Sequence, residues 1–460
     1  MKLFPMITVV LSLGLVVPAG LAQETSQDAP KPAVVDVAES GPAHLGGEAP
    51  ALAIGSDVES RNVLVAGFSL GAAYDSRGLY NSTTNTFSGE ARYFVQPSIA
   101  FQRTFSTGGW TLSYTPGFGY APDDQENTQY TQNLAGDLHW RPSERLLLHV
   151  RQDYSLTDNP FETVGRVDLL PGLGGPLGPN YSGVLPDTKR TSLVTNADLS
   201  YRVGEHSAIG MTGGFQKFNY DSTQSSANTT VSYVNSEVIT GSVFYSRQFS
   251  ETLSAGMQMT YMDIYSTGAE VARTQAPAPM LFVKMNPAPH TEITLYAGPE
   301  YARTREVVTS MLGSSSILVS TVDYEHHWYP TYGGTVAWHG ARNGFDVQAD
   351  RRVAAGGGVL EAAQSTSAGA GYRVRAAEKL LAEVRANYAD QKGIGLLASG
   401  VYFRSLWVGG GPVVEMSRSW SLRGDVAYVH QEDKGLGAVA GNHMLVQGSL
   451  EYRFHKSLGE

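Results

Sequence analysis

The chain has 460 residues, of which 42% are hydrophobic and 17% are charged, and its formal net charge is −10. This acidic balance argues against a nucleic-acid-binding protein, which usually carries a basic face. The absence of cysteine excludes disulfides, thiolate metal sites, a cysteine nucleophile and the lipidated cysteine of a lipoprotein. No internal stretch reaches the roughly 18 apolar residues that a membrane-spanning helix needs.

The N-terminus has the pattern of a secretory signal peptide. Lys2 supplies a positive charge, Ile7–Val17 forms a short apolar core, and Gly20 and Ala22 are small residues at a cleavage site. We therefore expect residues 1–22 to be removed. Residues 23–61 are rich in Ala, Pro, Gly and acidic residues and contain no aromatic residue, which predicts a disordered periplasmic leader.

Residues 62–454 alternate with a period of two, which is typical of strands rather than helices. In the clearest case, Trp110–Tyr120, one face carries only Trp, Leu, Tyr, Pro and Phe, and the other carries only Thr, Ser and Gly. The pattern recurs along the chain and is less clean around 235–249 and 396–416. It predicts an all-β protein of about 16–18 antiparallel strands, with 18 as the best estimate.

The turns between these strands alternate in length. Short turns are expected at positions such as Ser106–Gly109 and Arg141–Glu144, and long loops at Asp75–Glu90, Thr157–Arg190 and Arg303–Thr321. Transmembrane up-and-down β-barrels have short periplasmic turns and long outer loops. Both chain ends are then expected in the periplasm.

Aromatic residues are sorted by turn length. The predicted girdles are Trp110, Trp140, Trp338 and Trp420 near short turns, and Tyr120, Tyr154, Tyr301, Tyr388 and Tyr428 near long loops. Amphipathic rings of membrane barrels gather at the two headgroup levels, whereas a soluble sandwich has no reason to sort them in this way. Trp328 and Trp407 do not fit the pattern.

Charged residues occupy the faces opposite the apolar ones. The candidate lumen-lining residues are Arg92, Arg151, Asp153, Asp198, Arg202, Glu292, Glu300, Arg373, Arg375, Glu383, Arg385, Arg423 and Asp425. They either set a field that selects solutes or cross-link the lumen through salt bridges. The long loop Thr157–Arg190 either folds inward as a constriction or forms an outer lid.

The last strand, Met444–Phe454, alternates apolar residues and ends on an aromatic residue. It resembles the C-terminal assembly signal of Gram-negative outer-membrane proteins, although residues 455–460 extend beyond the usual end as a tail. In pattern, 63–454 is similar to the putative β-barrel porins, some of which accompany exopolysaccharide export. The resemblance implies an integral outer-membrane location and contact with outer-membrane lipid and lipopolysaccharide. It also implies recognition of the last strand by the assembly machinery, and possible periplasmic export partners.

The best catalytic candidate is the stripe Asp323, Glu325 and His327, which indicates either a rim protease or metal site, or a polar junction between loop and strand. No second acid–histidine cluster accompanies it. The glycine runs at 356–358 and 409–411 are not followed by a helix, so they are not phosphate loops. We assign no catalytic, cofactor or metal residue and expect no enzyme activity.

A barrel of 16–18 strands is wide enough for an aqueous channel. The sequence therefore predicts a porin-like channel for small polar solutes. Three alternatives remain open: an outer-membrane component of an exopolysaccharide export system, an outer-rim hydrolase, and a surface scaffold or adhesin.

Overall fold

The structure, a computed structural model, describes most of the chain from residue 62 onward. The described ranges are 62–81, 86–122, 128–157, 189–220, 234–267, 271–311, 318–358, 360–395, 400–434 and 441–457. The expected signal peptide (1–22) and leader (23–61) lie outside them, as does most of the loop Thr157–Arg190. In the described part of the chain, no helix has the length and apolar character needed to cross a membrane.

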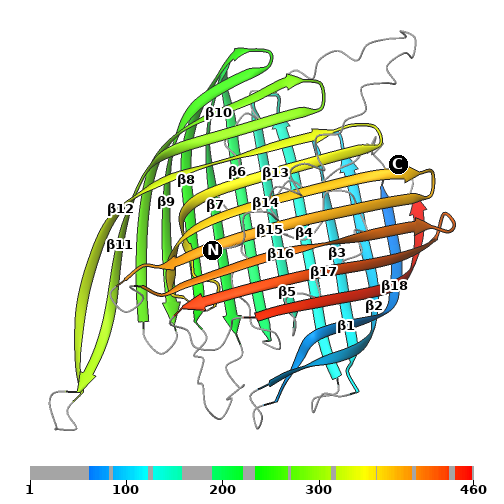
Figure 1. The fold of residues 1–460 in the computed structure, drawn as a ribbon. Helices are drawn as coiled ribbons and strands as arrows, with labels where there is room; N and C mark the ends of the chain where they lie inside the picture. Colours follow the sequence, from blue (N-terminus) through cyan, green and yellow to red (C-terminus); the bar gives the residue numbers. More distant parts are fainter. Residues whose placement is uncertain are drawn as a thin grey trace, which may run out of the picture. The chain divides into compact units, whose positions relative to one another are not determined.

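Eighteen strands make up the described fold (Figure 1). They are β1 (Val63–Asn81), β2 (Thr86–Phe105), β3 (Gly108–Tyr120), β4 (Thr128–Ser143), β5 (Leu146–Thr157), β6 (Arg190–Gly204), β7 (Ser207–Tyr220), β8 (Asn235–Ser250), β9 (Leu253–Thr267), β10 (Val271–Ala288), β11 (Thr291–Met311), β12 (Leu318–His339), β13 (Asn343–Ala355), β14 (Ala362–Ala377), β15 (Leu380–Gly393), β16 (Tyr402–Glu415), β17 (Trp420–Lys434) and β18 (Gly441–Ser457).

The sheet closes on itself. Each strand pairs antiparallel with its neighbour in sequence, and β1 also pairs antiparallel with β18, so the order returns to its start. The predicted all-β, up-and-down antiparallel barrel and the best estimate of 18 strands are confirmed. Closure satisfies the ladder hydrogen bonds that an open sheet would leave at its edges.

The two faces of the barrel differ sharply in chemistry. Outward positions expose large apolar side chains on every part of the wall, for example Leu112 on β3, Met257 on β9 and Val426 on β17. Inward positions are mostly small, polar or charged. Exposed apolar area of this extent on a closed antiparallel barrel is the lipid-facing surface of a membrane-spanning barrel.

Several segments expected as long loops are strand instead. β1 continues to Asn81 and β2 starts at Thr86, within the expected loop Asp75–Glu90. The β11–β12 pair likewise runs to Met311↔Leu318, across most of the expected loop Arg303–Thr321. Beyond the lipid both faces of a strand meet water, so the apolar alternation stops while the backbone ladder continues. The expectation of loops at these positions was wrong for that reason.

The C-terminal strand is longer than expected. β18 continues through His455, Lys456 and Ser457, which pair with Val65, Leu64 and Val63 of β1. Half of the expected tail therefore belongs to the seam that closes the barrel.

On the inner face, aromatic rings lie over glycines of the neighbouring strand. Phe94 is directly opposite Gly71, Phe244 opposite Gly210, and Phe282 opposite Gly256. The absence of a Cβ makes room for the ring: a Cβ at Gly256 would lie 2.6 Å from Cζ of Phe282. In each pair only the aromatic residue has a side chain, so the inner surface is filled without two large side chains projecting into the lumen at the same place.

One side of the barrel departs from the regular ladder. β12 pairs with β11 from Leu318 to Trp338, but with β13 only over Tyr332–His339. After Arg351, the last residue of β13 that pairs with β12, the strand leaves β12 and turns into the lumen. There the β13–β14 connection meets the inner wall of β7–β11, and a cluster of buried apolar side chains forms.

Candidate functional site: the inner face of the barrel

A repeated two-residue charge pattern lines the inner face. On six strands an arginine pairs with an acid two positions away, so that both side chains point inward from the same strand. The pairs are Glu90–Arg92, Arg151–Asp153 (2.9 Å), Asp350–Arg352 (2.9 Å), Glu383–Arg385, Arg423–Asp425 (2.7 Å) and Glu451–Arg453 (3.0 Å). Each pair lies along its own strand, parallel to the wall.

Other inward charges pair between strands. His149 on β5 lies between Asp137 on β4 and Asp198 on β6, with N–O distances of 2.8 Å and 3.6 Å. Arg373 on β14 reaches Glu383 on β15 at 3.4 Å. All three strands of the histidine cluster are neighbours in the sheet, so this cluster also follows the wall.

Candidate residues near the short turns take part in weaker, more exposed contacts. Glu292 on β11 faces Lys284 on β10 at 3.3 Å, and Arg375 on β14 faces Glu415 on β16 at 3.8 Å. Arg202 lies near the end of β6, where its backbone N–H donates to the carbonyl of Arg145. Exposed pairs of this kind contribute little to stability.

Glu300 has a structural role that its charge alone does not indicate. Its carboxylate is buried and accepts hydrogen bonds from the Thr331 hydroxyl (2.5 Å) and from the backbone N–H of Val353 (2.8 Å). Val353 lies where β13 separates from β12, so Glu300 supplies the acceptor that the ladder would otherwise provide. This candidate lumen residue holds the departing strand in place.

The inward charges are not spread evenly around the barrel. The inward positions of β7–β10, named the neutral wall here, carry Ala, Gly, Ser, Thr, Gln, Asn, Val, Ile, Met and aromatic residues. Lys284, near a short turn, is the one charged residue among their described inward positions. The charged wall comprises the inward positions of β13–β18 and β1–β6, which carry all six two-residue pairs.

Sequence reasoning missed several members of this network. Glu90 was placed in an expected loop, and Asp137, His149, Asp350 and Arg352 were not singled out. For Glu90, Asp350 and Arg352 the signal was present, because an acid and an arginine two residues apart within a strand must share a face. Asp137 and His149 pair between strands, so no spacing within one strand marks them. The members of the pairs on β5, β15 and β17 were all among the predicted lumen-lining residues.

The predicted girdle residues all lie on strands, several of them near a strand end. The tryptophans at the short-turn end contact other rings: Trp110 stacks on Phe101 at 4.9 Å, and Trp420 lies 4.9 Å from Tyr452. The others are Trp140 near the end of β4 and Trp338 near the end of β12. The tyrosines are Tyr120, which ends β3, Tyr154 on β5, Tyr301 on β11, Tyr388 on β15 and Tyr428 on β17.

The two tryptophans that did not fit are now placed. Trp328 pairs directly with Tyr301 on β11, and their ring centroids lie 5.0 Å apart, so it lies beside one of the predicted girdle tyrosines. Trp407 lies on β16 opposite Asn387 and points inward beside Gly409. It is a residue of the charged wall.

The stripe Asp323, Glu325 and His327 lies on β12 above the barrel wall. His327 and Glu325 are within 2.5 Å, while Asp323 accepts a hydrogen bond from the backbone of Tyr324 at 2.7 Å. Among the described residues, no group of three histidine, aspartate or glutamate side chains is arranged to hold a metal ion.

No protein-family model matches the sequence, and no curated protein matches it. Three solved outer-membrane structures are similar in fold. The ferric-catecholate import receptor Fiu of E. coli K12 is 8% identical, with a TM-score of 0.44 over 85% of this chain and 81% of the receptor. The outer membrane protein OpdK of Pseudomonas aeruginosa is 11% identical, with a TM-score of 0.38 over 85% and 99%. The ferric citrate transporter FecA is 10% identical, with a TM-score of 0.42 over 90% and 82%.

Proposed function

We propose that this barrel is a porin-like channel that lets small polar solutes cross the Gram-negative outer membrane. The observation that carries the proposal is the set of six arginine–acid pairs along the inner face. Most of these side chains are largely buried in the wall, and each has a partner of opposite sign that offsets its desolvation; a lining of ion pairs favours a polar lumen over an apolar, filled one. Eighteen strands also provide the width of an aqueous channel.

The direction of the pairs supports an open path. The pairs named above join residues of one strand, of neighbouring strands, or in one case of next-but-one strands. Such pairs lie against the wall instead of linking opposite sides. The two interpretations of the lumen charges are then compatible, because the pairs rigidify the wall and still present both signs to a passing solute.

The test is conductance of the purified protein in a planar bilayer, with neutral sugars of graded size as blockers. We expect stepwise conductance that small sugars reduce and large ones do not. Replacing Arg423 with Gln leaves Asp425 unbalanced, so the reversal potential in a salt gradient should shift toward cation selectivity. The double variant Arg423→Gln/Asp425→Asn should return it toward the original value.

The control is Arg247→Gln, which removes an arginine from an exposed outward position and should leave selectivity unchanged. A folded barrel that never conducts, with and without residues 23–61, would contradict the proposal. In that case the export component, which conducts little without its partners, becomes the better assignment.

A further inference from the structure

A short segment crosses from the charged wall to the neutral wall inside the barrel. This inner shelf consists of residues 353–358 and 360–362, together with Ile394 from the end of β15. Within it, the backbone N–H of Ile394 donates to the carbonyl of Ala362 at 3.0 Å. The shelf therefore joins the β13–β14 connection to the start of the β15–β16 connection.

Hydrogen bonds with three other strand regions anchor the shelf. Val353 donates to Glu300 of β11, and the hydroxyl of Ser266 on β9 donates to the carbonyl of Glu361 at 2.7 Å. The N–H of Val234, just before β8, donates to the carbonyl of Gly358 at 2.9 Å. Polar anchors at separate points indicate a fixed position rather than a chance apolar contact.

Gly358 allows the closest of these approaches. Its φ of 89° lies in the region that glycine adopts without strain, and a Cβ there would lie 2.5 Å from Cζ of Tyr220 at the end of β7. The glycine run at 356–358 is not followed by a helix, so it is not a phosphate loop. Its role in the structure is to form the bend that brings the shelf into contact with the wall.

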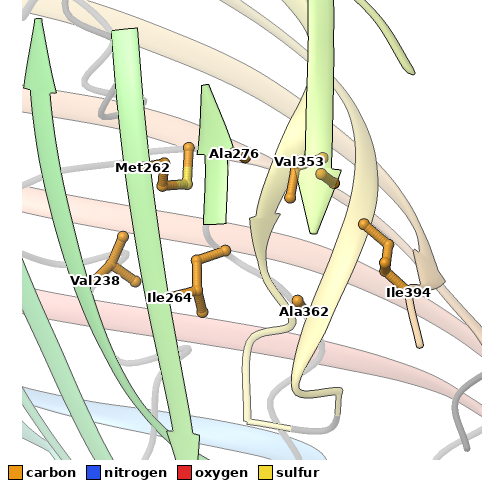
Figure 2. Packing of buried hydrophobic residues seen from close by; sticks show 8 residues of the cluster. Val238, Met262, Ile264, Ala276, Val353, Ala362 and Ile394 are labelled. Carbon is orange, nitrogen blue, oxygen red and sulfur yellow. The ribbon is translucent and has the colours of Figure 1, made fainter. Parts of the chain in front are cut away.

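Apolar side chains fill the space between the shelf and the neutral wall (Figure 2). Val353, Ala362 and Ile394 contribute from the shelf. Val238, Met262, Ile264 and Ala276 face them from β8, β9 and β10, and Ala302 joins from β11. Ala276 is 0% exposed and Ala302 is 1% exposed, so water does not reach this part of the wall.

We propose that the inner shelf closes the neutral side of the lumen, so that solutes pass along the charged wall and the shelf limits the width of the path. The proposal rests on the proposed channel function. It follows from two coincident facts. The inward positions of β8–β10 beneath the shelf carry no charge, with the buried Glu300 and Glu306 of β11 at their edge, and the six ion pairs lie on strands outside this wall. A solute on the other side of the shelf therefore meets charge of both signs on one flank and the shelf on the other.

Because the chain has no cysteine, single cysteines can report which wall is open. We would compare Ala276→Cys, beneath the shelf, with Asn387→Cys, an inward position of the charged wall, using a small charged methanethiosulfonate reagent. We expect Asn387→Cys to react readily and to lose conductance on labelling. Ala276→Cys should react at least about tenfold more slowly, because labelling there requires the shelf to open locally.

The second part of the experiment uses variants that weaken the attachment of the shelf. Leu360→Ser removes a buried apolar side chain of the shelf, and Ser266→Ala removes its hydrogen bond to Glu361. With both changes, Ala276→Cys should label at a rate close to that of Asn387→Cys, conductance should rise, and larger sugars should enter. Heat-modifiable gel migration verifies that each variant is a folded barrel.

Equal labelling of the two single cysteines in the otherwise unchanged protein would overturn the proposal. So would continued protection of Ala276→Cys after the shelf is loosened, because the protection would then come from elsewhere. Labelling is read by mass on the folded protein and needs no current. A barrel that shows the protected pattern but never conducts would therefore remove the channel function and leave the shelf in place.

Discussion

At the scale of single residues, the inner wall depends on glycines as much as on charges. Phe282 and Gly256 face each other across β10 and β9, and the ring occupies the volume that any other side chain at position 256 would need. A large residue opposite glycine keeps the wall filled, while two large residues in the same place would push the ring into the lumen or the strands apart.

We therefore expect Gly256→Ala to lower the free energy of unfolding by about 1–3 kcal/mol, the usual cost of overpacking a filled site. The added Cβ would meet the Phe282 ring and, closer still, the carbonyl of Tyr245. Urea unfolding of the barrel in lipid vesicles measures the change. Gly241→Ala on β8 is the matched control, because nothing lies within 4 Å of its added Cβ. Equal effects of the two substitutions would show that the close contact does not matter.

At the scale of elements, the sequence identified strands best where the two faces differ in polarity. The segments around 235–249 and 396–416 were less clean because apolar residues also point inward there, such as Phe244 on β8 and Trp407 on β16. The alternation also fails beyond the lipid, where β11 and β12 continue with polar residues on both faces. Hydrophobic periodicity reports the environment of a strand, so it loses strands whose two faces share one environment.

The last strand pairs with β1 and also carries the predicted assembly signal, and a truncation can test these two roles separately. Removing residues 455–460 deletes three residue pairs between β18 and β1 but leaves Phe454 as the terminal aromatic residue. We expect this shortened chain to reach the outer membrane in normal amount as a heat-modifiable barrel. Phe454→Ala in the shortened chain should reduce that amount strongly. The quantity of folded barrel in outer-membrane fractions measures both. Equal amounts for the two chains would remove Phe454 from any assembly signal.

At the scale of the whole molecule, closure and strand number could be predicted, whereas the inner shelf could not. Alternation and turn spacing are read from short stretches of sequence. Together they give an even number of antiparallel strands, which is the pattern of a closed barrel. The shelf depends on contacts between residues such as Ser266 and Glu361, which lie far apart in the sequence. Only the glycine run at 356–358 marks its position, and a glycine run has several possible meanings.

The direction of the barrel in the membrane remains a prediction, and cysteine labelling on cells can test it. The stretch from Trp420 to Tyr428 on β17 has the length of a transmembrane strand, about 9–11 residues. If the predicted girdle tyrosines mark one lipid boundary, the parts of β11 and β12 beyond Tyr301 and Trp328 project outside the lipid. If both termini are periplasmic, Asp323→Cys on β12 should react on intact cells with a maleimide attached to a polymer too large for the pore. Glu378→Cys, in the short turn after β14, should react only after the outer membrane is permeabilised. Both positions are exposed, so access and not burial decides the result. The opposite pattern would place the short turns and both chain ends outside the cell.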